Sequence, residues 1–171
     1  MIRKLLDGLY TASGVMAALC LIVILGLIVV QMVARWTGEV FPGAPDYAGY
    51  AMAAASFLAF ANALNKGSHI RVSILLNAVG ERAKYWLEVW CFSVATAVAW
   101  YIAYYIWVMR GYAIRFNDVS QGQDATPIAI AQFPILVGSI ILAIAVTDNL
   151  VSLFVAGKHN IVRDVSDTQA E

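Results

Sequence analysis

Four long uncharged stretches constrain this chain more than any other feature of its sequence. The first runs from Gly8 to Ala34, 27 residues with an aliphatic centre. A helix needs about 20 apolar residues to cross the hydrocarbon part of a bilayer, so this stretch can cross with some tilt. A cleaved signal peptide is the alternative, because Arg3 and Lys4 give a basic start. The apolar run continues for ten residues past Cys20, however, so we expect a retained membrane helix.

Three further stretches have the same character and complete one membrane domain over residues 1–171. The chain is 61% apolar and 13% charged, whereas soluble domains are roughly half apolar and a quarter charged. Loops rich in Gly, Pro, Asn and Asp separate the stretches and cannot continue the helices. We therefore predict an all-α membrane protein with four transmembrane helices and a polar tail at 157–171. The predicted spans are 9–34, 47–65, 85–109 and 128–155.

The segment between the second and third spans passes from apolar to basic at Asn65 and Lys66. From 70 to 79 the apolar residues follow the i, i+3, i+4, i+7 spacing of one helix face. Ten residues are too few to cross a bilayer. The pattern predicts a short amphipathic helix that lies at the membrane interface.

The distribution of basic residues predicts the orientation. Four crossings place both termini on the same side of the membrane. The termini and the middle loop hold eight Lys and Arg residues, whereas the other two loops hold Arg35, Arg110 and Arg115. By the positive-inside rule, both termini and the middle loop face the cytoplasm.

The remaining charged residues fall near the ends of the predicted spans. Glu88 and Asp148 come near the inner border, and at the outer border Arg35 can pair with Asp46. Three basic residues are candidates to pair with the two inner carboxylates: Arg71, Arg82 and Lys84.

Aromatic residues mark both ends of the third span. Trp86 and Trp90 lie at its start, and Tyr104, Tyr105 and Trp107 lie toward its end. Aromatic belts at the two membrane interfaces have this distribution, so we expect a belt rather than a ligand platform.

Alanines repeat every four residues in the second span, at Ala51, Ala55 and Ala59. Small residues in this register let another helix approach closely in lipid. The approaching helix can belong to this chain or to a partner protein, and both alternatives stay open.

The sequence carries no recognisable site of its own. The predicted helix centres are unbroken and uncharged, whereas a self-sufficient transporter needs broken helices or a buried charge there. His69 and His159 fall outside the spans, which argues against haem. Cys20 and Cys91 lie in apolar runs without a nearby partner, and a net charge of zero gives no case for nucleic acid. We expect a non-enzymatic scaffold, without cofactor or metal, that needs a partner protein.

Several short motifs resemble a known family. Gln-Met-Val-Ala-Arg closes the first span at 31–35, an acidic residue opens the second, and Thr126-Pro127 precedes Pro134 and Gly138. The most specific piece is Gly67-Ser-His69-Ile70-Arg71-Val72 after the second span. Together they resemble the DctQ-type small membrane subunit of TRAP (tripartite ATP-independent periplasmic) transporters. The chain departs from the family pattern at Asp46, Ala59 and Ser73, where Glu, Gly and Asp are more usual.

The resemblance implies a small, non-catalytic subunit of a sodium-driven, binding-protein-dependent transporter for an organic acid or similar solute, in the bacterial inner membrane. It would brace the large membrane subunit and help dock the periplasmic binding protein. The alternative is a membrane anchor or assembly subunit of a respiratory or other inner-membrane complex. The expected partner contacts are Arg35, Asp46, Ala51, Ala55, Ala59, Arg110 and Arg115, and the expected inner-border residues are Gly67, His69, Ile70, Arg71 and Val72.

Overall fold

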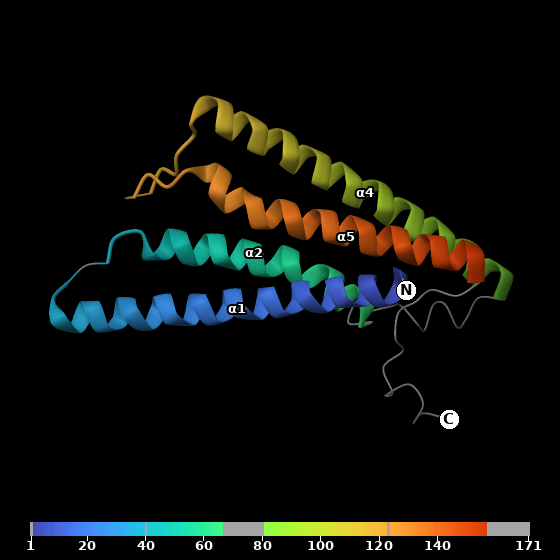
Figure 1. Ribbon diagram of the computed structural model, residues 1–171, viewed down its shortest axis with the longest axis horizontal. Helices are drawn as coiled ribbons and strands as arrows, with labels where there is room; N and C mark the ends of the chain where they lie inside the picture. Colours follow the sequence, from blue (N-terminus) through green and yellow to red (C-terminus); the bar gives the residue numbers. More distant parts are fainter. Residues whose placement is uncertain (1, 40, 67–80, 123, 157–171) are drawn as a thin grey trace, which may run out of the picture.

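The computed structural model describes residues 2–39, 41–66, 81–122 and 124–156, and within them the chain folds into four long helices (Figure 1). All four are long and apolar enough to cross a membrane, which confirms the predicted all-α fold. The amphipathic helix predicted at 70–79 lies outside the described residues. The helices are α1 (Ile2–Thr37), α2 (Ala44–Asn65), α4 (Glu81–Phe116) and α5 (Ile128–Ala156).

The helices form two hairpins that lie side by side in one row. α1 packs on α2, α2 packs on α5, and α5 packs on α4, so α1 and α4 are the edges of the row (Figure 1). The connecting segments 38–43 and 117–127 lie together at one end, here called the loop end. The N-terminus and the last turn of α5 lie at the opposite end, here called the terminal end. Both ends of the described chain are therefore on one side of the bundle.

The two edge helices are longer than the spans expected from the sequence. α1 and α4 each have 36 residues, whereas α2 has 22 and α5 has 29. At 1.5 Å per residue an edge helix is about 54 Å long, well beyond the roughly 30 Å hydrocarbon core of a bilayer. α4 continues to Phe116 instead of ending near residue 109. Both edge helices are therefore longer than a bilayer core is thick, so each must tilt or extend beyond a border.

α1 and α4 end at the loop end in the same way. The Glu39 amide donates to the Ala34 carbonyl at 2.9 Å, and the Asp118 amide donates to the Ala113 carbonyl at 3.0 Å. The residue before each donor, Gly38 or Asn117, has a positive φ of 77° or 50°. This is the left-handed cap that commonly stops an α-helix and satisfies its last carbonyls.

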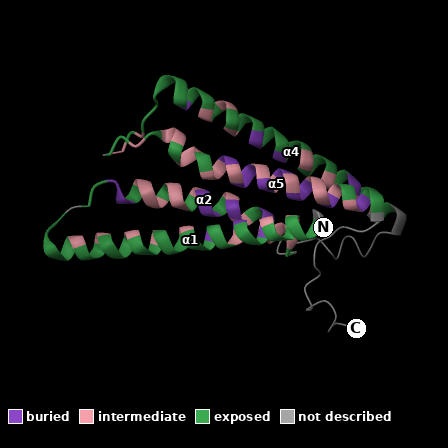
Figure 2. Ribbon diagram, viewed as in Figure 1, coloured by how far each residue is buried: buried purple, intermediate pink, exposed green. Residues whose placement is uncertain are grey.

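Small residues on the two middle helices make up much of the core, in which Tyr10 of α1 and Ile141 of α5 are also buried. Ala54, Ala55 and Ala61 of α2 are buried, as are Ala143 and Ala145 of α5. Figure 2 shows this burial along α2 and α5, while the outward faces of α1 and α4 are exposed. Because small side chains let backbones come close, the middle pair packs tightly and the edges stay open.

Candidate functional site

The loop end is a polar surface at which the first two turns of α2 dock onto the 117–127 segment. The Tyr50 hydroxyl donates to Ser120 Oγ at 2.5 Å, and Thr126 Oγ1 donates to the Tyr47 hydroxyl at 3.3 Å. The Gly122 amide also donates to Ser120 Oγ, at 3.2 Å. The two tyrosine bonds join residues 70 and 79 positions apart in the sequence. They hold the start of α2 against the 117–127 segment.

Two carboxylates fit against two glycines across this surface. The Asp46 carboxylate lies where a side chain on Gly122 would be, and the Asp124 carboxylate lies where a side chain on Gly43 would be. Gly43 also has a φ of +76°, which a residue with a Cβ adopts only at a cost. Only glycine fits at these two positions without displacing a carboxylate.

Backbone hydrogen bonds also join the two sides of the 117–127 segment. The Ser120 amide donates to the Thr126 carbonyl at 2.7 Å, and the Ile128 amide donates to the Asp118 carbonyl at 3.1 Å. Ala125 has a φ of +45°, which is uncommon for a residue with a Cβ. The segment is therefore a closed turn that presents a fixed face at the loop end.

Arg110 fastens α4 to the start of α5. Its Nε donates to the Ala129 carbonyl at 3.2 Å, and its guanidinium carbon lies 5.4 Å from the centre of the Phe133 ring. A cation at this distance from an aromatic face is attracted to it. The Arg110 charge, predicted as a partner contact, is thus half-buried inside the chain.

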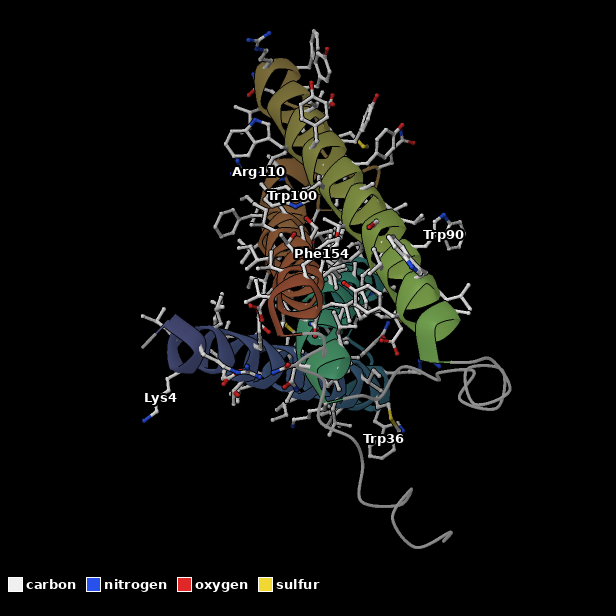
Figure 3. All side chains as sticks on the ribbon, turned by 90° about the vertical axis from the view of Figure 1, so that its right-hand side faces the viewer. Lys4, Trp36, Trp90, Trp100, Arg110 and Phe154 are labelled. Atoms are coloured by element: carbon white, nitrogen blue, oxygen red, sulfur yellow. The ribbon has the colours of Figure 1, made fainter. Side chains whose placement is uncertain are left out.

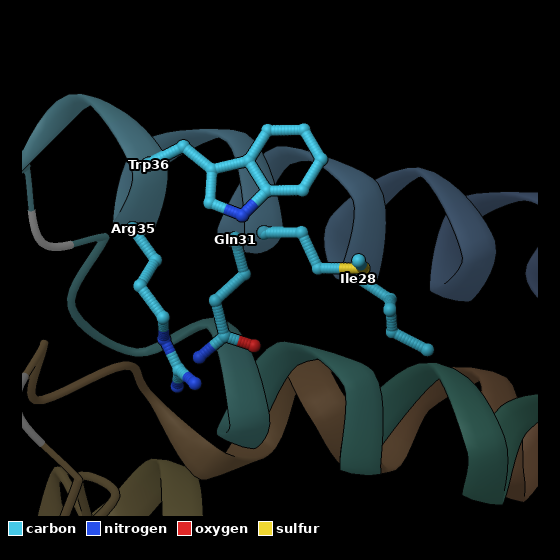
Figure 4. A pocket seen from close by; sticks show the side chains of 5 residues that line it. Ile28, Gln31, Arg35 and Trp36 are labelled. Atoms are coloured by element: carbon cyan, nitrogen blue, oxygen red, sulfur yellow. The ribbon is translucent and has the colours of Figure 1, made fainter.

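The other two predicted basic contacts are exposed at the loop end. Arg115 lies in the last turn of α4. Arg35 lies at the end of α1, and Figure 4 shows Arg35 and Gln31 pointing from α1 toward α2 beside a shallow hollow that only α1 lines. The expected ion pair between Arg35 and Asp46 is wrong, since these two described side chains form no salt bridge and Asp46 instead faces Gly122.

The predicted alanine positions divide between inside and outside. Ala55 is buried within the chain, whereas Ala51 and Ala59 are partly exposed. A close approach to the α2 backbone is made by a residue that the alanine spacing did not indicate. A Cβ on Gly138 of α5 would lie 2.6 Å from the Phe57 carbonyl carbon.

The terminal end contains polar residues that sequence reasoning missed. Tyr10 is 2% exposed, and its hydroxyl has no hydrogen-bond partner among the described residues. Asn149 is 1% exposed and donates from Nδ2 to the Ala145 carbonyl at 2.8 Å. Asn62 of α2 fills the space beside Gly14 of α1. A polar residue among the apolar residues near a helix end was the available signal in each case.

The predicted inner-border residues cannot be compared with the fold. Gly67, His69, Ile70, Arg71 and Val72 lie outside the described residues. The expected pairing of Glu88 and Asp148 with Arg71, Arg82 or Lys84 depends on the side chains of these three basic residues, which are not among the described side chains. No group of three or more His, Cys, Asp or Glu side chains that could hold a metal ion occurs in the described part of the chain.

The comparison with protein families gives the chain its class. The sequence model for Tripartite ATP-independent periplasmic transporters, DctQ component, matches residues 24–156, which is more than half of the chain. No curated protein sequence matches this chain. The matched region includes the second part of α1 and all of α2, α4 and α5. A tripartite transporter of this family implies two further components, the large membrane component DctM and a periplasmic binding protein. The chain therefore belongs to the DctQ family and is a non-catalytic membrane component of a TRAP transporter.

Proposed function

We propose that this chain is a fixed brace for the large membrane component of a sodium-driven TRAP transporter that carries an organic acid or similar solute. Its two termini face the cytoplasm of a bacterial inner membrane. The distribution of basic residues supports this orientation. The termini and the middle loop hold eight basic residues against three in the other loops. The loop end would then face the periplasm, where a binding protein arrives.

The exposed edge helices of the bundle are the observation that supports the brace proposal. α1 and α4 stand at the edges of a single row, and large apolar side chains along both are exposed. A row of helices has two broad faces and two edges, so it offers much surface to a neighbour for few residues. If the large component moves a substrate-carrying part through the membrane, its stationary part must stay at a fixed depth. Four added helices that cross the bilayer would hold it there.

The helix faces and the inner border have separate roles in this proposal. Ala51 and Ala59 would let a helix of the large component approach α2, because both are partly exposed. Ala55 is assigned to packing inside the chain, where it is buried. The resemblance alone supports the role of the inner-border residues, which would fix the depth of the bundle at the cytoplasmic surface: Gly67, His69, Ile70, Arg71 and Val72.

The loop end would help to dock the binding protein. The bond that Tyr50 donates to Ser120, the bond that Tyr47 accepts from Thr126 and the fit of Asp46 against Gly122 make this surface firm. A firm surface binds a partner without a large ordering cost. Arg35 and Arg115 are exposed there and can attract acidic residues of a partner.

The brace is tested by reconstituting the large component in liposomes with and without this chain. Binding protein loaded with its solute is supplied outside, and sodium-driven uptake is measured. We expect uptake to depend on the chain, and full restoration when it is added during reconstitution. Full sodium-driven uptake by the large component alone would exclude an essential brace. An unrelated four-helix membrane protein of similar length serves as the control for non-specific stabilisation.

A further inference from the structure

The exposed faces of the two edge helices differ in chemistry. In α1 the segment from Val15 to Val30 has no hydroxyl, amide or charged side chain, and its exposed large residues are aliphatic apart from Met16. α4 instead exposes three tyrosines in two turns. Tyr101, Tyr104 and Tyr105 are 62%, 63% and 47% exposed, and we call them the tyrosine face.

The tyrosine face points away from the rest of the bundle. α4 buries Ala99 and Ala103, and α5 is the helix on which it packs. Tyr101 and Tyr105 are each two residues from Ala103, which places both roughly 160° around the helix from it. Their rings contact one another, with centroids 4.5 Å apart, and Tyr104 lies 5.5 Å from Tyr105. The three rings form one outward-facing cluster.

Two contacts with α5 give the depth of this cluster. On the loop-end side of the tyrosines, Arg110 contacts Phe133. On the other side, Trp100 Nε1 donates to Thr147 Oγ1 at 3.1 Å. Figure 3 shows Trp100 and Arg110 on the side of α4 nearer α5. The α5 segment from Phe133 to Thr147 carries no charge, so the tyrosine face lies beside the middle of an apolar helix.

This depth differs from the interfacial belt that the sequence predicted for Tyr104 and Tyr105. The reason is the length of α4, which continues to Phe116. At 1.5 Å per residue the helix extends about 16 Å beyond Tyr105. Tyr112 and Phe116, toward the end of α4, are nearer a loop-end belt position.

The hydroxyls of the tyrosine face lack partners. No described residue accepts a hydrogen bond from Tyr101, Tyr104 or Tyr105, although the nearby Trp100 indole is paired with Thr147. Hydrocarbon tails offer no acceptor, and an unpaired hydroxyl in an apolar medium costs about 1–3 kcal/mol in protein measurements. Three such groups together are poorly suited to face lipid.

We propose that the tyrosine face of α4 is the surface that packs against the large membrane component, which supplies hydrogen-bond acceptors at mid-membrane depth. The aliphatic face of α1 is then the lipid-facing edge. This inference rests on the proposed function and goes further by adding a contact on one face of α4 to the approach along α2. Backbone carbonyls next to helix breaks, or hydroxyl, amide and carboxylate side chains, are the acceptors that fit.

Site-specific photocrosslinking tests the assignment in the assembled complex. The full chain is co-expressed with its large component, with the photoreactive residue p-benzoyl-phenylalanine in place of Tyr101 or Tyr105. The matched control carries it in place of Ile22, which is 63% exposed on α1. We expect illumination to join positions 101 and 105 to the large component and position 22 to lipid only. Crosslinks from 101 and 105 only to lipid, or to a second copy of this chain, would overturn the inference.

Removal of the hydroxyls gives a second measurement that leaves the rings in place. The double variant Tyr101→Phe and Tyr105→Phe should retain roughly 3- to 10-fold less large component on an affinity column, as two lost membrane hydrogen bonds predict. Tyr112→Phe is the control near the loop end and should retain the wild-type amount. Unchanged retention by the double variant would count against the hydroxyl contacts. If the unmodified chain retained no large component, the proposed function would fail, and this inference with it.

Discussion

Gly138 of α5 lies directly against the backbone of Phe57 in α2, where a Cβ would be 2.6 Å from the Phe57 carbonyl carbon. The amide nitrogen of Leu58 would be 2.8 Å away. Neither is the end of a flexible side chain, so neither can turn aside. This contact sets how closely the two middle helices approach, and through them how the two hairpins join.

Replacing Gly138 by Ala should therefore separate α2 from α5. We expect a loss of about 1–3 kcal/mol in stability, as for other overpacked sites, measured by thermal unfolding of the chain in detergent. Gly49→Ala is the matched control on α2, since nothing lies within 4 Å of a Cβ at that position. Equal melting temperatures for the two variants would contradict the close approach.

The contact between Gly43 and Asp124 predicts that alanine costs more stability at Gly43 than at Gly38, although the two glycines have the same backbone conformation. Gly38 and Gly43 have φ of 77° and 76°, but only Gly43 faces other side chains, the Asp124 carboxylate and, farther away, the Tyr47 ring. Ala at either position should cost about 1 kcal/mol for the positive φ. Gly43→Ala should cost about 1 kcal/mol more because the added Cβ meets the carboxylate.

A double-mutant cycle isolates this extra cost. Asp124→Ala should recover part of the stability lost in Gly43→Ala and none of that lost in Gly38→Ala, because only the first pair is in contact. Denaturation in detergent gives each free energy of unfolding. Additive effects in both pairs would mean that Asp124 and Gly43 do not meet in solution.

The sequence predicted the number and type of the helices because long uncharged runs leave few alternatives to membrane spans. It did not predict where α4 ends, since a helix can continue into water once its apolar part has crossed. It also did not indicate that Arg110 lies against Phe133 or that Asp46 lies against Gly122. Contacts between segments some 20 to 80 residues apart depend on how the hairpins meet, which no local pattern contains.

Two buried or half-buried tyrosines should respond in opposite directions when their hydroxyls are removed. Tyr50→Phe loses the bond to Ser120 and should cost about 1 kcal/mol. Tyr10→Phe removes a hydroxyl that no described residue pairs with, so it should be neutral or stabilising by up to about 1 kcal/mol. Thermal unfolding of both variants in the same detergent checks the signs. A loss at Tyr10 equal to that at Tyr50 would show that the Tyr10 hydroxyl is paired in the folded chain.

The exposed arginines of the loop end should affect docking without affecting stability. In reconstituted transporter, Arg35→Gln or Arg115→Gln should raise the binding-protein concentration needed for half-maximal uptake roughly 2- to 5-fold, as surface charge pairs allow. The difference from wild type should shrink in high salt, because exposed charges are screened.

Two further arginines separate this effect from general damage. Arg3→Gln at the terminal end should leave the concentration dependence unchanged. Arg110→Gln should lower the melting temperature, because it loses the bond to the Ala129 carbonyl and the contact with Phe133. If both Arg35→Gln and Arg115→Gln needed the wild-type concentration of binding protein for half-maximal uptake, the two arginines would not contribute to docking.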